Sequence, residues 1–102
     1  MSLFKFFKKR NKIWWWERYR ELNLCNGEIL FIADDEEDMI EITYADGMLI
    51  DVGKDLTNQY CITVVSSNDE TGWKNPLFEV KVADKEELVE KIQETILGFR
   101  RV

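Results

Sequence analysis

An alternating stretch on both sides of Asp46-Gly47 constrains the fold of this chain most strongly. Every second residue of 40–44 is apolar, and a second apolar run occupies residues 48–52 after the dipeptide. Alternation at a period of two places one set of side chains on one face of a strand, and Asp-Gly tolerates the positive φ angles of a tight turn. The pattern therefore predicts a β-hairpin.

Three further segments have strand character. Residues 28–33 form a short, nearly continuous apolar run, which predicts a central strand. Residues 60–65 are rich in β-branched side chains, and apolar and charged residues alternate over 78–82. Residues 66–76 are polar apart from Trp73 and predict a loop.

Helical patterns lie at both ends of the strand region. Trp15, Tyr19 and Leu22 fall on one helical stripe, and Asp84 with Glu87 has the spacing of a capping box. The second helix then carries an apolar stripe of Leu88, Val89, Ile92, Ile96 and Phe99. The order predicts an α+β domain: a mostly antiparallel five-stranded sheet with an N-terminal and a C-terminal helix packed on one face.

The length of 102 residues suits one domain, because a chain of this size buries roughly 60 to 65% of its unfolded surface. We divide the chain into a basic and aromatic leader, residues 1–12, and a single domain, residues 13–102.

The residue types argue against catalysis. The chain has no histidine, and its two cysteines, Cys25 and Cys61, lie in no Cys-x-x-Cys pair, so nucleophile activation and a tetrahedral metal site both lack their groups. We expect reduced thiols, no enzyme activity, no metal and no cofactor.

Charge is distributed unevenly along the chain. Residues 1–20 carry seven basic side chains and one acidic, whereas the remainder carries seven basic and nineteen acidic. An acidic body disfavours direct nucleic-acid binding and favours a cationic partner. Solubility alone is the simpler explanation of the same acids.

The leader leaves two alternatives open. Lysines interrupt its apolar residues too early for a secretory signal, but Leu3, Phe6 and Phe7 share a helical face that could contact an anionic membrane. Bases interleaved with aromatics over residues 8–20 also have the composition of a single-strand nucleic-acid platform.

Two features of the body suggest a protein-binding surface. One is an acid surface centred on residues 34–38. Adjacent carboxylates attract a cationic partner, and they contribute more to the specificity of binding than to its affinity. The other is Trp73, a large apolar side chain that could anchor an interface or fold back over the sheet edge. The candidate partner-binding residues are Asp34, Asp35, Glu36, Glu37, Asp38, Asp46, Asp51, Asp69, Glu70 and Trp73.

The run Met48-Leu49-Ile50-Asp51-Val52-Gly53, the segment Trp73-Lys74-Asn75-Pro76-Leu77 and the closing helix over residues 85–96 carry a family resemblance. Over residues 38–97 the chain resembles the immunity proteins of bacterial polymorphic toxin and contact-dependent growth inhibition systems.

The resemblance implies a cytoplasmic inhibitor that binds one cognate toxin domain and covers its active site. Many such toxins are nucleases with basic clefts, so the acidic surface would stand where nucleic-acid phosphates bind. The alternative is a non-enzymatic protein-binding or peripheral-membrane module that uses the basic N-terminus.

Overall fold

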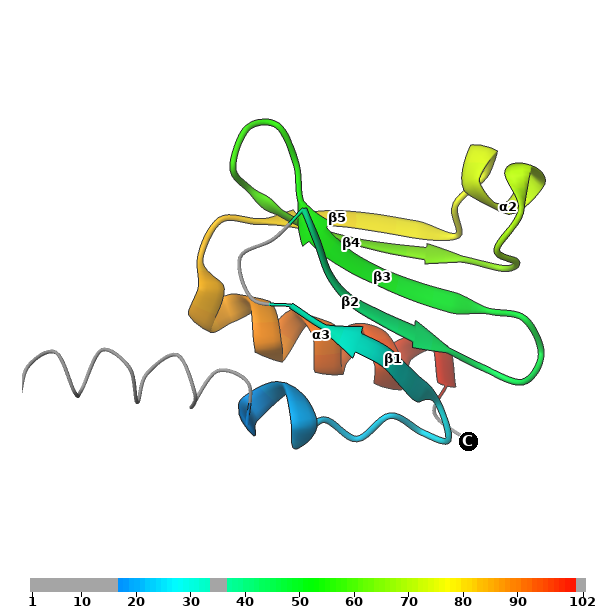
Figure 1. Ribbon diagram of the computed structural model, residues 1–102, viewed down its shortest axis with the longest axis horizontal. Helices are drawn as coiled ribbons and strands as arrows, with labels where there is room; N and C mark the ends of the chain where they lie inside the picture. The colour runs from blue at the N-terminus through cyan, green and yellow to red at the C-terminus, as the bar shows by residue number, and fades with distance from the viewer. Residues whose placement is uncertain (1–16, 34–36, 101–102) are drawn as a thin grey trace, which may run out of the picture.

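The computed structural model describes residues 17–33 and 37–100, and within them a helical turn at residues 17–20 precedes five strands and two helices (Figure 1). The elements are β1 (Glu28–Ile32), β2 (Asp38–Thr43), β3 (Leu49–Lys54), β4 (Tyr60–Val65), α2 (Glu70–Lys74), β5 (Phe78–Val82) and α3 (Lys85–Arg100). Each strand pairs antiparallel with the next, so the sheet order is β1-β2-β3-β4-β5. The predicted α+β class and its five-stranded sheet are confirmed.

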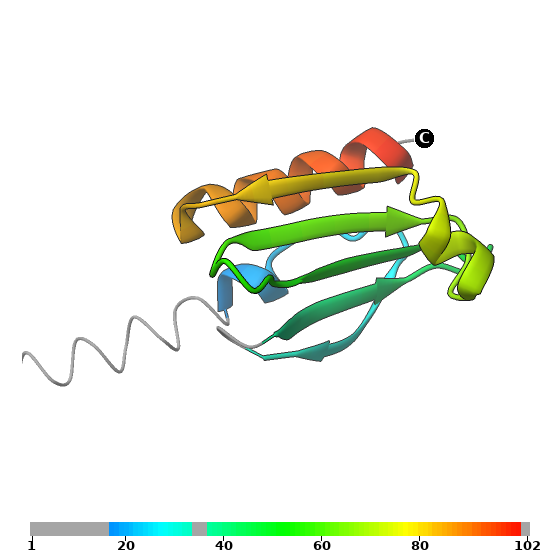
Figure 2. The ribbon, with the colours of Figure 1, turned by 90° about the horizontal axis from the view of Figure 1, so that it is seen from above.

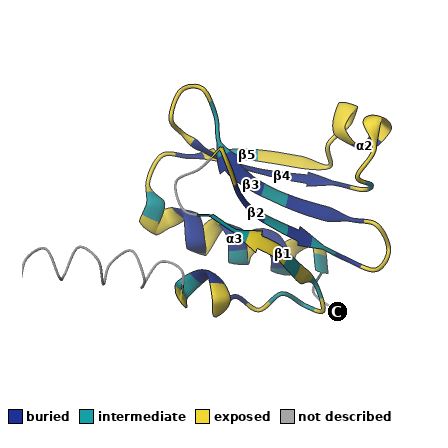
Figure 3. Ribbon diagram, viewed as in Figure 1, coloured by how far each residue is buried: buried dark blue, intermediate teal, exposed yellow. Residues whose placement is uncertain are grey.

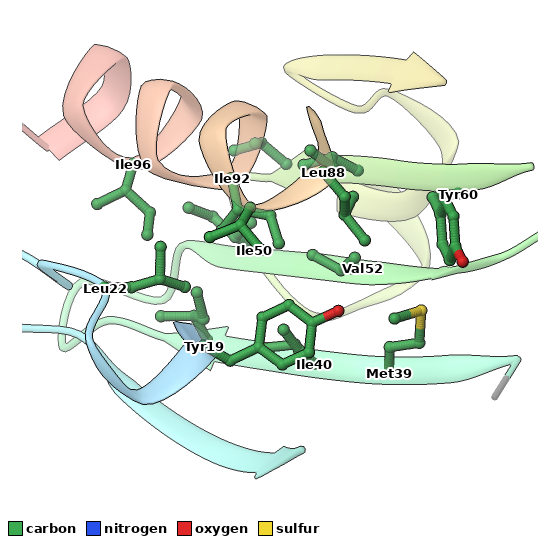
Figure 4. Packing of buried hydrophobic residues seen from close by; sticks show 14 of the residues in the cluster. Tyr19, Leu22, Met39, Ile40, Ile50, Val52, Tyr60, Leu88, Ile92 and Ile96 are labelled. Carbon is green, nitrogen blue, oxygen red and sulfur yellow. The ribbon is translucent and has the colours of Figure 1, made fainter. Parts of the chain in front are cut away.

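The core lies between one face of the sheet and α3, which packs against β4 and β5 (Figure 2). Period-two alternation turns the apolar side chains of the inner strands toward this helix. Figure 4 shows them interlocked with the helix side chains. The fully buried members include Ile40, Ile42, Ile50, Val52, Ile62, Val64, Leu88, Ile92 and Ile96.

The N-terminal segment contributes to the same core. Tyr19 is fully buried on the helical turn, and Leu22 is buried just after it, as the predicted stripe requires (Figure 4). The leader, residues 1–12, and Trp15 lie outside the described residues.

The predicted hairpin of β2 and β3 closes through three residues instead of two. The amide of Tyr44 donates to the Met48 carbonyl at 3.0 Å, and Gly47 has φ of 98°. The glycine supplies the left-handed residue of a three-residue hairpin loop. This loop length sets the pairing of residues 40–43 with residues 49–52, up to the register shift between Asp38 and Ile40.

The predicted N-cap of α3 is confirmed. The Asp84 carboxylate accepts from the Glu86 amide at 2.9 Å, and the Leu88 amide donates to the Asp84 carbonyl at 3.0 Å. Two glutamates in the first turn and Arg100 in the last complement the helix dipole.

Two predictions are wrong. The segment predicted as a central strand is β1, which lies at the edge of the sheet with Leu30 and Phe31 exposed. The segment predicted as a loop contains the short helix α2. Asp69 caps this helix, and Gly72 packs so closely on the Ser67 carbonyl that a larger residue would collide with it.

Along the described part of the chain, no helix has the length and apolar character that crossing a membrane requires.

Candidate functional site

The sheet face opposite α3 brings acidic side chains of different strands together. Glu41 of β2 pairs directly with Asp51 of β3, and Asp38 of β2 pairs with Gly53, two residues further along β3. Ile50 and Val52 alternate with Asp51 and belong to the core, so these carboxylates lie on the other side of the sheet. We call Asp38, Glu41 and Asp51 the open-face acids.

The electrostatics of the open-face acids are unfavourable in the free protein. Partial burial, followed by the negative charges of Asp38 and Glu41, raises the pKa of Asp51 to about 6. Like charges directly opposite on neighbouring strands destabilise a sheet. A cation bound over these carboxylates would relieve this repulsion.

Glu37 is the first described residue of the acid run after the gap, and it directly precedes β2. Glu37 is exposed, and its carbonyl accepts the Lys54 amide at 3.1 Å. An added Cβ at Gly53 would collide with that carbonyl oxygen, so glycine permits the close approach of the two chain segments. Asp34, Asp35 and Glu36 lie outside the described residues.

Asp46 lies in the hairpin loop at the other end of β2 and β3 (Figure 1). Its carboxylate binds Arg100 Nη1 at 2.7 Å, and this hydrogen bond lowers the pKa of Asp46. The same guanidinium lies 4.3 Å from the centre of the Tyr44 ring. The structure therefore uses Asp46 to fasten the end of α3 to the hairpin.

The remaining predicted acids belong to α2. Asp69 accepts from the Gly72 amide at 2.8 Å and from Ser67 Oγ at 2.9 Å, and these bonds lower the pKa of its carboxyl. Glu70 forms an ion pair with Lys74 at 3.0 Å. Both residues are exposed but have local structural roles.

Trp73 lies on α2 with 40% of its surface exposed, and its indole Nε1 donates to Asn68 Oδ1 at 2.8 Å. The hydrogen bond fixes the ring orientation while leaving part of its apolar face in solvent. A ring held this way suits an anchor, because little side-chain entropy is lost when a partner covers it.

The predicted acid surface is therefore divided. Asp38 and Asp51 lie on the open face and Glu37 directly precedes β2, whereas Asp46, Asp69 and Glu70 lie at the far end near α2 (Figure 1). The structure adds Glu41, which was not among the predicted site residues. The hairpin register, worked out from the apolar pattern, is the signal that would have found it.

The loop between β3 and β4 contributed no residue to the predicted site. The Asp55 carboxylate accepts from the Thr57 amide at 2.8 Å, Thr57 Oγ1 at 2.6 Å and the Gln59 amide at 3.1 Å, and it binds Lys81 Nζ at 2.9 Å. These partners, Thr57 first and then Lys81, hold the pKa of Asp55 well below its usual range. The side chain of Leu56 in this loop is fully exposed to solvent. Leu56, Asp55 and Glu37 line a shallow surface hollow.

The described residues contain no group of three or more histidine, cysteine or acidic side chains arranged to hold a metal ion. Cys25 and Cys61 are free thiols, each half-buried. The open face offers clustered carboxylates, a charge pattern that attracts cations.

Comparisons of the chain with protein families, with characterised proteins and with solved structures give no significant match.

Proposed function

We propose that this chain is an immunity protein that binds a cognate cationic toxin domain, most simply a nuclease, and blocks its active site. The observation that carries the proposal is the pairing of Glu41 with Asp51 on the open face, with Asp38 close enough to raise the Asp51 pKa. A sheet that keeps like charges opposite one another gains stability when a partner supplies the opposite charge.

The geometry supports an inhibitor in two further ways. A sheet face is rigid, so its carboxylates are held in place before the partner arrives and little ordering entropy is lost on binding. Trp73 and Leu56 add apolar contact residues at the two ends of the sheet. A nuclease cleft that binds phosphates through lysine and arginine would meet carboxylates in their place.

The proposed role requires no catalysis and no cofactor, and it places the protein in the cytoplasm, where a toxin would act. The alternative is a non-enzymatic protein-binding or peripheral-membrane module that uses the leader. No observation on the described residues favours it, since the leader lies outside them.

The test is binding and growth rescue with a candidate toxin domain from an adjacent gene. Stable binding together with rescue supports the proposal. Failure of both, with a folded chain and an active toxin, overturns it.

Charge variants then locate the surface. Asp38→Asn with Glu41→Gln should slow association about tenfold and flatten its salt dependence, because steering by surface charge contributes roughly 10- to 1,000-fold to on-rates. The matched control is Glu86→Gln with Glu90→Gln, which removes the same two charges from exposed positions of α3. Equal effects from the two pairs would assign steering to net charge and remove the open face from the site.

A further inference from the structure

The outer edge formed by β5 is an exposed strand with apolar neighbours. Figure 3 shows β5 largely exposed beside the buried β3 and β4. Leu77, which directly precedes the strand, is 52% exposed, and Phe78 and Phe99 are each 37% exposed. An unpaired strand edge also offers backbone N–H and C=O groups to another chain.

A groove runs between this edge and α3. Its floor and walls include Phe78, Val80, Thr95 and Phe99, and the two aromatic rings meet edge-on with centroids 5.9 Å apart. Gly98 also borders the groove, and a Cβ added there would have no atom within 4 Å. The helix thus leaves open apolar space along the strand edge.

The charges of β5 are complementary to those of the same strand reversed. In an antiparallel pair centred on Val80, Glu79 of one copy lies opposite Lys81 of the other, twice over, and Phe78 lies opposite Val82. Lys81 already contacts Asp55 at 2.9 Å, but an ammonium has three donors and this side chain is 53% exposed. It can therefore bind a second carboxylate.

The other edge of the sheet, β1, also exposes apolar side chains, Leu30 and Phe31, but it lacks the regular register and the charge complementarity of β5. The register of β1 on β2 shifts between Ile29 and Phe31, whereas β5 pairs with β4 without a shift. A bulge bends an edge strand away from further pairing. Reversing β1 about Leu30 also brings no opposite charges together.

We propose that two copies of this chain associate through β5, in an isologous antiparallel pair that extends the sheet across both molecules and covers the groove beside α3. Leu77, Phe78 and Phe99 supply the apolar contact, and the two Glu79–Lys81 pairs fix the register. A two-fold axis through Val80 closes the assembly as a dimer. The open-face acids lie on β2 and β3, which β4 separates from β5, so the dimer can be tested without reference to the proposed function.

A charge exchange tests the register by sedimentation and light scattering. The wild type should be a dimer. Glu79→Lys alone places lysine opposite lysine and Lys81→Glu alone places glutamate opposite glutamate, so each variant should dissociate at least tenfold more readily. Mixing the two variants should restore a dimer that contains one copy of each, because every cross-strand pair is then opposite in charge.

Two leucine substitutions, one at each edge of the sheet, test which edge associates. Neither substitution alters the contact between Asp55 and Lys81, which Lys81→Glu removes. Leu77→Ser should weaken the dimer, whereas Leu30→Ser, at a residue 58% exposed on the β1 edge, should not. Thermal melts establish that each variant is folded. A wild type that is monomeric at every accessible concentration overturns the proposal, as does a monomer that binds a foreign extended peptide along β5. Single charge variants that dimerise like the wild type, or a dimer sensitive only at Leu30, also overturn it.

Discussion

Ile50 and Asp51 are neighbours on β3 and face opposite sides of the sheet. Ile50 is fully buried against α3, in a layer where adjacent side chains are apolar and close-packed. Asp51 is half-buried on the open face, in a layer where its nearest charged neighbours, Asp38 and Glu41, carry the same sign. The apolar layer therefore lowers the free energy of the folded chain, while the clustered open-face acids raise it at neutral pH.

The difference shows how the sheet separates stability from recognition. Packing on the covered face depends on side-chain volume, and the core cluster of the described residues contains no carboxyl group, so protonation between pH 4 and pH 7 does not change it. The open face depends on charge, so its contribution changes with protonation, ionic strength and any bound cation. A cationic partner that binds the open face would relieve the repulsion among the open-face acids without changing the packing of the core.

The largest expected effect is on the covered face. Ile50→Ala should lower the free energy of unfolding by about 3 kcal/mol, because it removes buried methylene groups and leaves a cavity beneath α3. Urea unfolding followed by circular dichroism measures the loss. A loss below about 1 kcal/mol would mean that this layer can collapse around the cavity and is packed less tightly than the burial indicates.

Gly53→Ala should lower the free energy of unfolding by about 2 kcal/mol, because the new Cβ must displace the Glu37 carbonyl. It acts where the acid run joins the open face, and the same unfolding experiment measures it. Gly47→Ala is a useful companion, since it strains a positive φ without a close contact. A Gly53→Ala variant as stable as the wild type would show that the chain around Glu37 is not held against β3.

The residues of the covered face can be predicted from the sequence, whereas the neighbours on the open face cannot. Alternation identified the hairpin strands, and through them the covered face. The open face depends on register, which changes with one residue of loop length. A two-residue Asp46-Gly47 turn would pair Ile42 with Asp51, whereas the observed three-residue loop pairs Ile42 with Ile50 and Glu41 with Asp51.

The wrong prediction for β1 has a related physical cause. The apolar run of β1 resembles a strand buried on both faces, but its position in the sheet order, which local sequence does not encode, leaves Leu30 and Phe31 exposed. The acid surface was predicted from proximity in sequence and stays a prediction. Within it, Asp46 binds Arg100 and Asp69 binds an α2 amide, contacts that only the folded structure creates.

Asp51→Asn should have a smaller effect of opposite sign. The folded-state pKa of Asp51 is raised from 3.8 to about 6, so the penalty for its charge is absent below pH 4, grows between pH 4 and 6 and is constant above. Because the group is partly exposed and screened, we expect the variant to be more stable by about 1 kcal/mol at pH 7. The gain should vanish at pH 4.

Unfolding curves at pH 4, 5, 6 and 7 measure this dependence. Asp55→Asn is the contrasting variant. Hydrogen bonds lower the pKa of Asp55, so its carboxylate stabilises the folded chain at pH 7, and replacing it with an amide should reduce the melting temperature. If Asp51→Asn were equally stabilising at pH 4 and pH 7, the benefit would come from the amide itself and the two faces would not differ in their response to pH.

The smallest expected effect concerns α3, the helix that covers one face of the sheet. Gly98→Ala should raise the free energy of unfolding by about 0.5 kcal/mol, because alanine favours the helix and its methyl group meets no atom within 4 Å. Denaturant unfolding of dilute protein, where subunits are separated, isolates this gain.

The methyl group also enters the groove beside β5, so the same variant should stabilise the separated chain while weakening its association. A variant that gains stability and associates unchanged would place the subunit contact on the strand edge alone. One that loses stability would show that Gly98 is needed for the packing of α3 itself, and that the groove is not open space.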